Sequence, residues 1–345
     1  MKKSIVVLFL SIVLLTGCAS KSNVQYRKQS FEQDKTDIVH DERQDEDINI
    51  CGGSINVLDS EGDSIGYHYE IYNGIVELTV DCSVSITDEE QLSNTELDVP
   101  IRMWLIENGN LVDFSIDGGD AKLSSQDITM KHSREQHKIQ FNGRQDMGYV
   151  TIMICMYPDY CLKTNYFMRQ GLFKYSFVND NNKTLNNRKP IKQDTAHYIE
   201  LSGELNNSGI DVWDTNLESD YLSSREMFYT PHISREDGQL WVKFNYSRDS
   251  DSVGNVVYRI MVICDGQVIP AFMGQYSCQA YTPADAGLGF QCPVDLNAIP
   301  QDGAHTFIAC AIPDYVVGEE SAIKKFTKNF GCQGCSSFRT RIVIE

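Results

Sequence analysis

The strongest constraint on this 345-residue chain is that part of its sequence occurs twice. Residues 155–160 read Cys-Met-Tyr-Pro-Asp-Tyr, and residues 310–315 read Cys-Ala-Ile-Pro-Asp-Tyr. Two earlier pairs of blocks match in the same order, namely Gly74–Leu78 with Gly238–Val242 and Arg102–Gly109 with Arg259–Gly266. The spacing between matching blocks drifts by a few residues, as loop insertions require. We therefore predict that residues 70–179 and 234–345 are two copies of one module, produced by tandem duplication.

The apolar pattern predicts that both copies consist of β-strands. Val76, Leu78 and Val80 alternate with polar residues, and Leu240–Tyr246 alternates in the same way, which is the two-residue period of a half-buried strand. Two longer runs, Tyr149–Tyr157 and Val256–Cys264, are almost continuously apolar and suit central strands. Asn-Gly and Asp-Gly pairs, which accept the positive φ of tight hairpin turns, separate the strands.

The predicted fold class is all-β, with two tandem Ig-like β-sandwich modules of Greek-key topology related by internal duplication. About seven short strands in roughly 110 residues favour the Ig-like arrangement. The same turn spacing also permits a jelly roll or another Greek-key arrangement. We place module 1 at residues 50–179, a linker at residues 180–198 and module 2 at residues 199–345.

The N-terminal segment is a targeting sequence. Two lysines precede an apolar run, Ile5–Leu15, that is shorter than the roughly 20 residues of a membrane-spanning helix. The run leads into Leu15-Thr16-Gly17-Cys18, which resembles the lipobox of bacterial lipoproteins. The resemblance implies that residues 1–17 are a signal peptide and that Cys18 becomes the lipidated N-terminus. Two or three acyl chains would then hold an extracytoplasmic protein at the membrane.

The residues that follow, 18–49, are polar and acidic, with hardly any aliphatic side chains. Such a segment cannot bury enough apolar area to offset its ordering entropy, so we predict a flexible stalk. The whole chain has a formal net charge of −18. This charge excludes nucleic acid as a partner, because phosphate binding depends on lysine and arginine. It also opposes anionic membrane surfaces, so the predicted membrane contact is the lipid on Cys18.

Cysteine usage favours disulfide bonds. The chain has 11 cysteines, and lipidation of one leaves an even number in an exported protein. The candidates are Cys278 with Cys292, which bracket a loop rich in Gly and Ala, and Cys332 with Cys335, which are close in sequence. The sequence alone does not fix the pairing.

Other roles for cysteine are less well supported. Cys332-Gln333-Gly334-Cys335 has neither the following helix of a redox motif nor the second ligand pair of a zinc site. The match between the two hexapeptides places Cys155 and Cys310 at corresponding strand positions, where buried thiols and bridges are equally compatible.

The motif search indicates no catalytic or metal site. The sequence contains neither G-x-S-x-G nor H-E-x-x-H, and its acidic loops do not have the spacing of a known calcium loop. We therefore predict no catalytic residues, no metal and no cofactor.

Five residues are candidates for binding. Asp159, Tyr160, Asp314 and Tyr315 belong to the repeated Pro-Asp-Tyr motif, and Trp213 could stack on a sugar ring. The alternative for the motif is that Pro ends a strand while Asp and Tyr shape the turn. The alternative for Trp213 is packing between the modules.

Together, these observations predict a lipid-anchored extracytoplasmic protein with a non-catalytic binding or envelope structural role. The expected partners are an envelope glycan or a surface protein, to which two modules could bind with avidity. One alternative is a cell-surface hydrolase acting on a wall or dietary polymer. The other is a purely structural spacer.

Overall fold

The structure, a computed structural model, describes residues 50–86, 99–156, 158, 172–182, 197–200, 209–213, 231–246, 255–282, 288–317 and 336–345. The predicted signal peptide and nearly all of the predicted stalk lie outside these residues. No helix in the described ranges is long and apolar enough to cross a membrane.

Among the described residues, the regular secondary structure consists almost entirely of β-strands, so the predicted all-β class is confirmed. The first group of strands comprises β1 (Ile50–Leu58), β2 (His68–Tyr69), β3 (Gly74–Ile86), β4 (Val99–Glu107), β5 (Asn110–Leu111), β6 (Phe114–Ile116), β7 (Gln126–Met130), β8 (Arg134–Gly143), β9 (Tyr149–Met156) and β10 (Leu172–Asn179). The second group comprises β11 (His197–Glu200), β12 (Gly209–Trp213), β13 (His232–Ile233), β14 (Leu240–Tyr246), β15 (Asn255–Cys264), β16 (Gln267–Val268), β17 (Ser277–Thr282), β18 (Leu288–Val294), β19 (Gly303–Val317) and β20 (Ser336–Ile344), with one 3-10 turn, η5 (Leu296–Ala298).

Strands β1–β10 form the first sandwich. One sheet has the order β1-β3-β8-β6, and the other has the order β2-β10-β9-β4-β5 with β7 also paired to β4. A hydrophobic core fills the space between the sheets. The sandwich has more strands than the seven we expected, because very short strands such as β2 and β5 extend the larger sheet.

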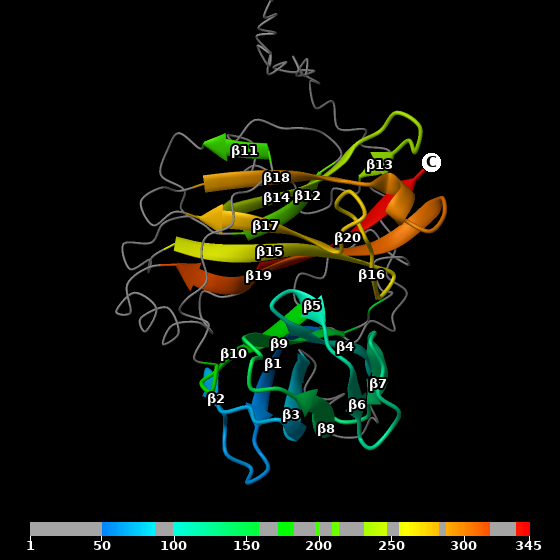
Figure 1. The fold of residues 1–345 in the computed structure, drawn as a ribbon. Helices are drawn as coiled ribbons and strands as arrows, with labels where there is room; N and C mark the ends of the chain where they lie inside the picture. Colours follow the sequence, from blue (N-terminus) through cyan, green and yellow to red (C-terminus); the bar gives the residue numbers. More distant parts are fainter. Residues whose placement is uncertain are drawn as a thin grey trace, which may run out of the picture. The chain divides into compact units, whose positions relative to one another are not determined.

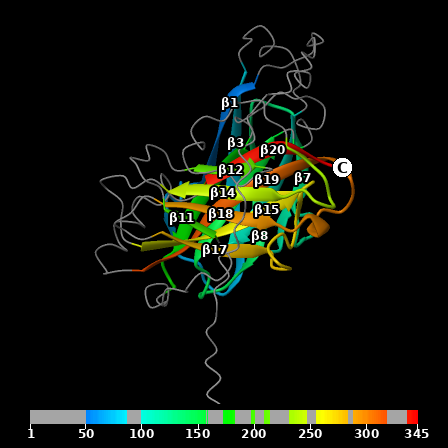
Figure 2. The same cartoon turned by 90° about the horizontal axis from the view of Figure 1, so that it is seen from above.

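Strands β11–β20 form the second sandwich, whose layers are visible in Figure 1 as β14 and β18 on one side and β15 and β19 on the other. Seen from above, β14, β15 and β18 lie along roughly the same axis, with β14 and β18 antiparallel, as in aligned sheet packing (Figure 2). Its sheets have the orders β11-β18-β14-β12 and β13-β20-β19-β15-β16, with β17 paired to β15. The first strand, β11, begins inside the predicted linker, at His197.

The two six-stranded sheets have the same strand order. Each strand of β2-β10-β9-β4-β5 has its counterpart in β13-β20-β19-β15-β16, and β7 corresponds to β17. Even the parallel pairing of a two-residue strand with the last strand occurs in both. The four-stranded sheets differ in one edge strand. The strand beside β8 is β6, which follows β5 along the chain, whereas the strand beside β18 is β11, which is the first strand of its sandwich. The shared order is what a duplication predicts; the duplication itself stays a prediction.

The strand register corrects one sequence match. Arg102 lies opposite Cys155, whereas its counterpart Arg259 lies opposite Ile312. The strand position of Cys310 is therefore equivalent to that of Met153, and the predicted match of Cys155 with Cys310 is wrong by two residues. A two-residue shift keeps a side chain on the same face of a sheet, so the apolar pattern alone could not reveal the shift.

The central strands of both six-stranded sheets are buried on both faces. In β4, Met103 and Leu105 face the core of the first sandwich, whereas Trp104 and Ile106 belong to a third hydrophobic cluster. This cluster, called here the inter-sandwich cluster, draws on both sandwiches. Its buried members are Trp104, Ile106, Met153, Cys155, Met261, Ile263, Ile308, Cys310 and Ile312. The long apolar runs therefore reflect burial on two faces rather than on one.

The contacts of two glycines at the edge of this cluster are nearly reciprocal. A Cβ atom on Gly109, at the tip of the β4–β5 hairpin, would lie 2.5 Å from Cδ of Arg259. A Cβ atom on Gly266, at the tip of the β15–β16 hairpin, would lie 2.6 Å from Nη1 of Arg102. The indole Nε1 of Trp104 also donates to the carbonyl oxygen of Gly266 at 3.1 Å. Each hairpin of one sandwich thus lies against an arginine of the other.

We predict that Trp104→Phe lowers the free energy of unfolding by about 1–3 kcal/mol, because it leaves the carbonyl of the buried Gly266 without its donor. Urea denaturation of the full-length chain measures this change. The control is Met261→Leu at the equivalent strand position, which conserves volume and should cost less than about 1.5 kcal/mol. Equal losses in the two variants would contradict a role for the hydrogen bond.

Candidate functional site

The prolines of the two Pro-Asp-Tyr copies occupy different structural positions. Pro158 follows β9 and lies outside any strand, whereas Pro313 lies within β19 opposite Tyr258. Asp314 falls at a register shift, because Tyr258 pairs with Pro313 and Val257 pairs with Tyr315. A bulge of this kind accommodates one extra residue in a strand. The proline of the second copy therefore does not end its strand, and Asp159 and Tyr160 of the first copy lie outside the described residues.

The remaining sequence candidates are brought together only in part. Trp213 is the last residue of β12, and the register places it opposite Trp241 of β14. Cys278 and Cys292 meet in the core of the second sandwich, where their Sγ atoms are 3.2 Å apart. Cys18, Cys332 and Cys335 lie outside the described residues.

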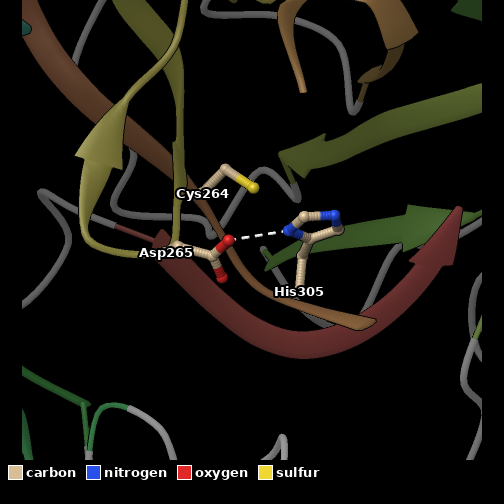
Figure 3. A group of neighbouring side chains, drawn as sticks. All are labelled: Cys264, Asp265 and His305. Atoms are coloured by element: carbon tan, nitrogen blue, oxygen red, sulfur yellow. Dashed lines mark hydrogen bonds and ion pairs between the residues drawn. The ribbon is translucent and has the colours of Figure 1, made fainter. Parts of the chain in front are cut away.

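A cluster that the sequence analysis did not single out lies where β15 turns into β16. Cys264, Asp265 and His305 each place one potential ligand atom within 4.8 Å of the others. Figure 3 shows the carboxylate of Asp265 facing His305, with Oδ2 2.7 Å from Nδ1. The imidazole is 1% exposed. Such a combination of thiol, carboxylate and imidazole could bind a metal or activate a nucleophile, so both roles need to be tested.

The hydrogen bonds of His305 do not favour metal binding. Its Nδ1 lies against the Asp265 carboxylate, and its Nε2 lies 2.9 Å from the carbonyl oxygen of Gln301. Both ring nitrogens therefore already lie within hydrogen-bond distance of an oxygen. A metal would have to displace one of these two oxygens.

Cys264 is also unsuited to nucleophilic catalysis. Burial, together with the nearby charge of Asp265, raises the pKa of its thiol to about 12. A reactive cysteine needs the opposite shift, because the thiolate is the nucleophile. The side chain belongs to the apolar core of the second sandwich. In this arrangement the carboxylate and the imidazole are hydrogen-bonded, and the thiol is part of the apolar core.

The first sandwich shows what those hydrogen bonds do. Asp265 has a φ of 48° and accepts from the backbone nitrogen of Thr306 through Oδ1 at 2.9 Å. Its counterpart Asn108 has a φ of 46° and accepts from the backbone nitrogen of Tyr149 through Oδ1 at 2.8 Å. Both side chains hold a left-handed turn against the neighbouring central strand. The repeated Asn-Gly and Asp-Gly pairs were the sequence signal for this arrangement.

The outer face of β14 carries a buried cation. The Lys243 side chain is 1% exposed, and burial lowers its pKa to about 8. The register places it between Asp211 of β12 and Gln291 of β18. Nothing in the apolar periodicity indicated this burial, because Lys243 occupies a polar position of the alternating pattern.

A small hollow lies beside β4 and β7. Its volume is about 200 Å³, and it is lined by Pro100, Ile101, Arg102, Asp127 and their neighbours. The two charged residues already pair with each other, with Nε of Arg102 2.7 Å from Oδ1 of Asp127. The hollow is smaller than the ~300–1,000 Å³ of typical small-molecule sites.

Comparisons with known proteins do not identify the chain. No protein-family model matches the sequence, and no curated protein is significantly similar to it. The C-terminal domain of the Streptococcus pyogenes antigen I/II-family protein AspA aligns with 86% of this chain and 100% of its own, at 9% identity and a TM-score of 0.21. CBD12 from CALX1.2 aligns with 83% and 99%, at 8% identity and a TM-score of 0.21. Scores this low do not establish a shared fold.

Substitutions of Asp265 test the structural role of the cluster. Asp265→Asn keeps the Oδ1 acceptor and the tolerance for positive φ, as Asn108 does naturally, so we expect a loss below about 1 kcal/mol. Asp265→Ala removes the acceptor and strains the turn, so we expect a loss of about 2–3 kcal/mol. Thermal and urea unfolding of the two variants provide the comparison. If both variants lost the same stability, the turn would not depend on this acceptor.

Lys243 predicts a specific pH dependence. Below about pH 8 the amine is charged in both states, whereas above it the folded state loses its proton before the unfolded state does. The unfolded state then binds more protons than the folded state, so the contribution of Lys243 to the free energy of unfolding rises with pH. The free energy of unfolding of the wild type, minus that of Lys243→Met, should rise by about 1.5 kcal/mol between pH 8 and pH 9.5. Urea titrations at these two pH values measure it, and a flat difference would exclude the shifted amine.

Proposed function

We propose that the chain is a lipid-anchored extracytoplasmic protein that acts by non-catalytic binding. The lipobox-like sequence ending at Cys18 supports the anchor. The acidic composition of residues 18–49 supports a stalk between the anchor and β1, which begins at Ile50. In this proposal the two sandwiches are carried outside the cell on a single tether.

The observation that best supports the binding role is the hydrophobic packing of the two sandwiches against each other. The inter-sandwich cluster buries side chains from both six-stranded sheets, and the paired hairpins contact arginines across it. A frame joined in this way fixes the strands from which its loops begin, which suits recognition. An envelope glycan or a neighbouring surface protein is the expected partner.

The contacts of the candidate cluster support binding over catalysis. In the described residues, the thiol, carboxylate and imidazole groups near His305 are committed to hydrogen bonds or to the core. The hollow beside Arg102 is small, and its charges are already paired. A hydrolase acting on a wall or dietary polymer remains the alternative function, and a spacer without a ligand is the third.

Two experiments test this proposal. The first compares membrane fractions of cells that express the wild type or Cys18→Ala, with mass spectrometry of the N-terminal peptide. We expect a lipid-modified Cys18 in the wild type and no lipid on this peptide in the variant. An unmodified wild-type N-terminus would contradict the anchor.

The second experiment incubates the purified protein without residues 1–18 with insoluble peptidoglycan and with envelope polysaccharide. Protein retained in the pellet and soluble product are measured from the same sample. Retention without products supports binding. Released products would establish a hydrolase, and neither retention nor products would favour the spacer; either result contradicts the proposal.

A further inference from the structure

The sulfur pair in the second sandwich joins its two sheets. Cys278 lies in β17 of the six-stranded sheet, opposite Ile260, and Cys292 lies in β18 of the four-stranded sheet, opposite Val242. Their Sγ atoms are 3.2 Å apart, and both residues belong to the core between the sheets. The two thiols are free in this structure, and a disulfide bond would shorten this separation to ~2.05 Å.

The first sandwich has a noncovalent link at the same place. Gln126 of β7 lies opposite Met103, the counterpart of Ile260, so its strand position matches that of Cys278. Its Nε2 donates to the carbonyl oxygen of Phe114 in β6, which belongs to the four-stranded sheet, at 2.7 Å. This position therefore connects the two sheets in both sandwiches, by a hydrogen bond in one and by a sulfur pair in the other.

We propose that Cys278 and Cys292 form a disulfide bond that ties together the two sheets of the second sandwich. The two thiols lose two protons and two electrons. An external disulfide, either that of a thiol–disulfide oxidoreductase outside the cytoplasm or oxidised glutathione, accepts them and becomes two thiols. In the cell this step rests on the export proposed above.

The burial of the pair determines when the bond can form. The hydrogen bond with Cys292, together with burial, raises the pKa of the Cys278 thiol well above its usual value. Because exchange requires a thiolate, the thiols react slowly once the sheets have closed over them. Oxidation therefore takes place before the second sandwich has finished folding. After folding, a reductant has little access, because the two residues are 5% and 1% exposed.

The test uses the full-length Cys18→Ala chain, unfolded and reduced, then refolded with a mixture of oxidised and reduced glutathione. Remaining thiols are alkylated, and the protein is digested without reductant and mapped by mass spectrometry. We expect the peptides of Cys278 and Cys292 to be linked. Their recovery as alkylated thiols, or linked predominantly to other cysteines, would overturn the proposal.

Two variants provide controls. Cys292→Ala should leave Cys278 alkylated, whereas Cys82→Ala, which removes a buried thiol of the first sandwich, should keep the link. Reduction of the linked wild type by dithiothreitol should be at least about 100-fold slower in native buffer than in denaturant. Equal rates would show that the bond is not the buried one. Because refolding takes place in vitro, these results do not depend on where the cell places the chain.

Discussion

The structure depends on an unusual requirement of its two larger sheets, which is that both of their faces must be covered. An antiparallel sheet usually packs one face on a core and exposes the other. Here Met103 and Trp104, neighbours in β4, face two different hydrophobic clusters. Neither six-stranded sheet could leave its second face in water without exposing residues such as Trp104 or Ile263. Each sandwich therefore supplies the cover for the other.

This requirement explains the contacts at the edge of the cluster and the role of the His305 group. Gly109 and Gly266 leave room for the arginines of the opposite sandwich, and a side chain at either position would collide with them. Asp265 and Asn108 fix the two hairpins that carry these glycines. The cluster of Cys264, Asp265 and His305, which resembles a catalytic site, thus supports the contact between the two sandwiches. The proposed binding function needs such a contact, because recognition by loops requires that the loops keep their positions.

The sequence predicts the all-β fold class and the repeated module, but it does not predict the inter-sandwich cluster. Alternation in β3 and the turn pairs beside Gly109 and Gly266 were enough to predict sandwiches, because a two-residue period follows directly from strand geometry. The continuous runs of β9 and β15 predict only central strands, since such a pattern indicates that both faces are buried but not what covers them. The two-residue error at Cys310 has a similar origin, because such a shift leaves the faces unchanged. The burial of Lys243 and the meeting of Asp265 with His305 depend on tertiary contacts that local patterns do not encode.

Hydrogen exchange of the wild-type chain tests the central claim most directly, namely that the two sandwiches stabilise each other through their six-stranded sheets. If they do, the slowest amides of β4 and β9 and those of β15 and β19 should exchange through one opening with the same free energy, because the inter-sandwich cluster is lost when either sandwich unfolds. Two clearly different opening free energies, one for each pair of strands, would contradict this account.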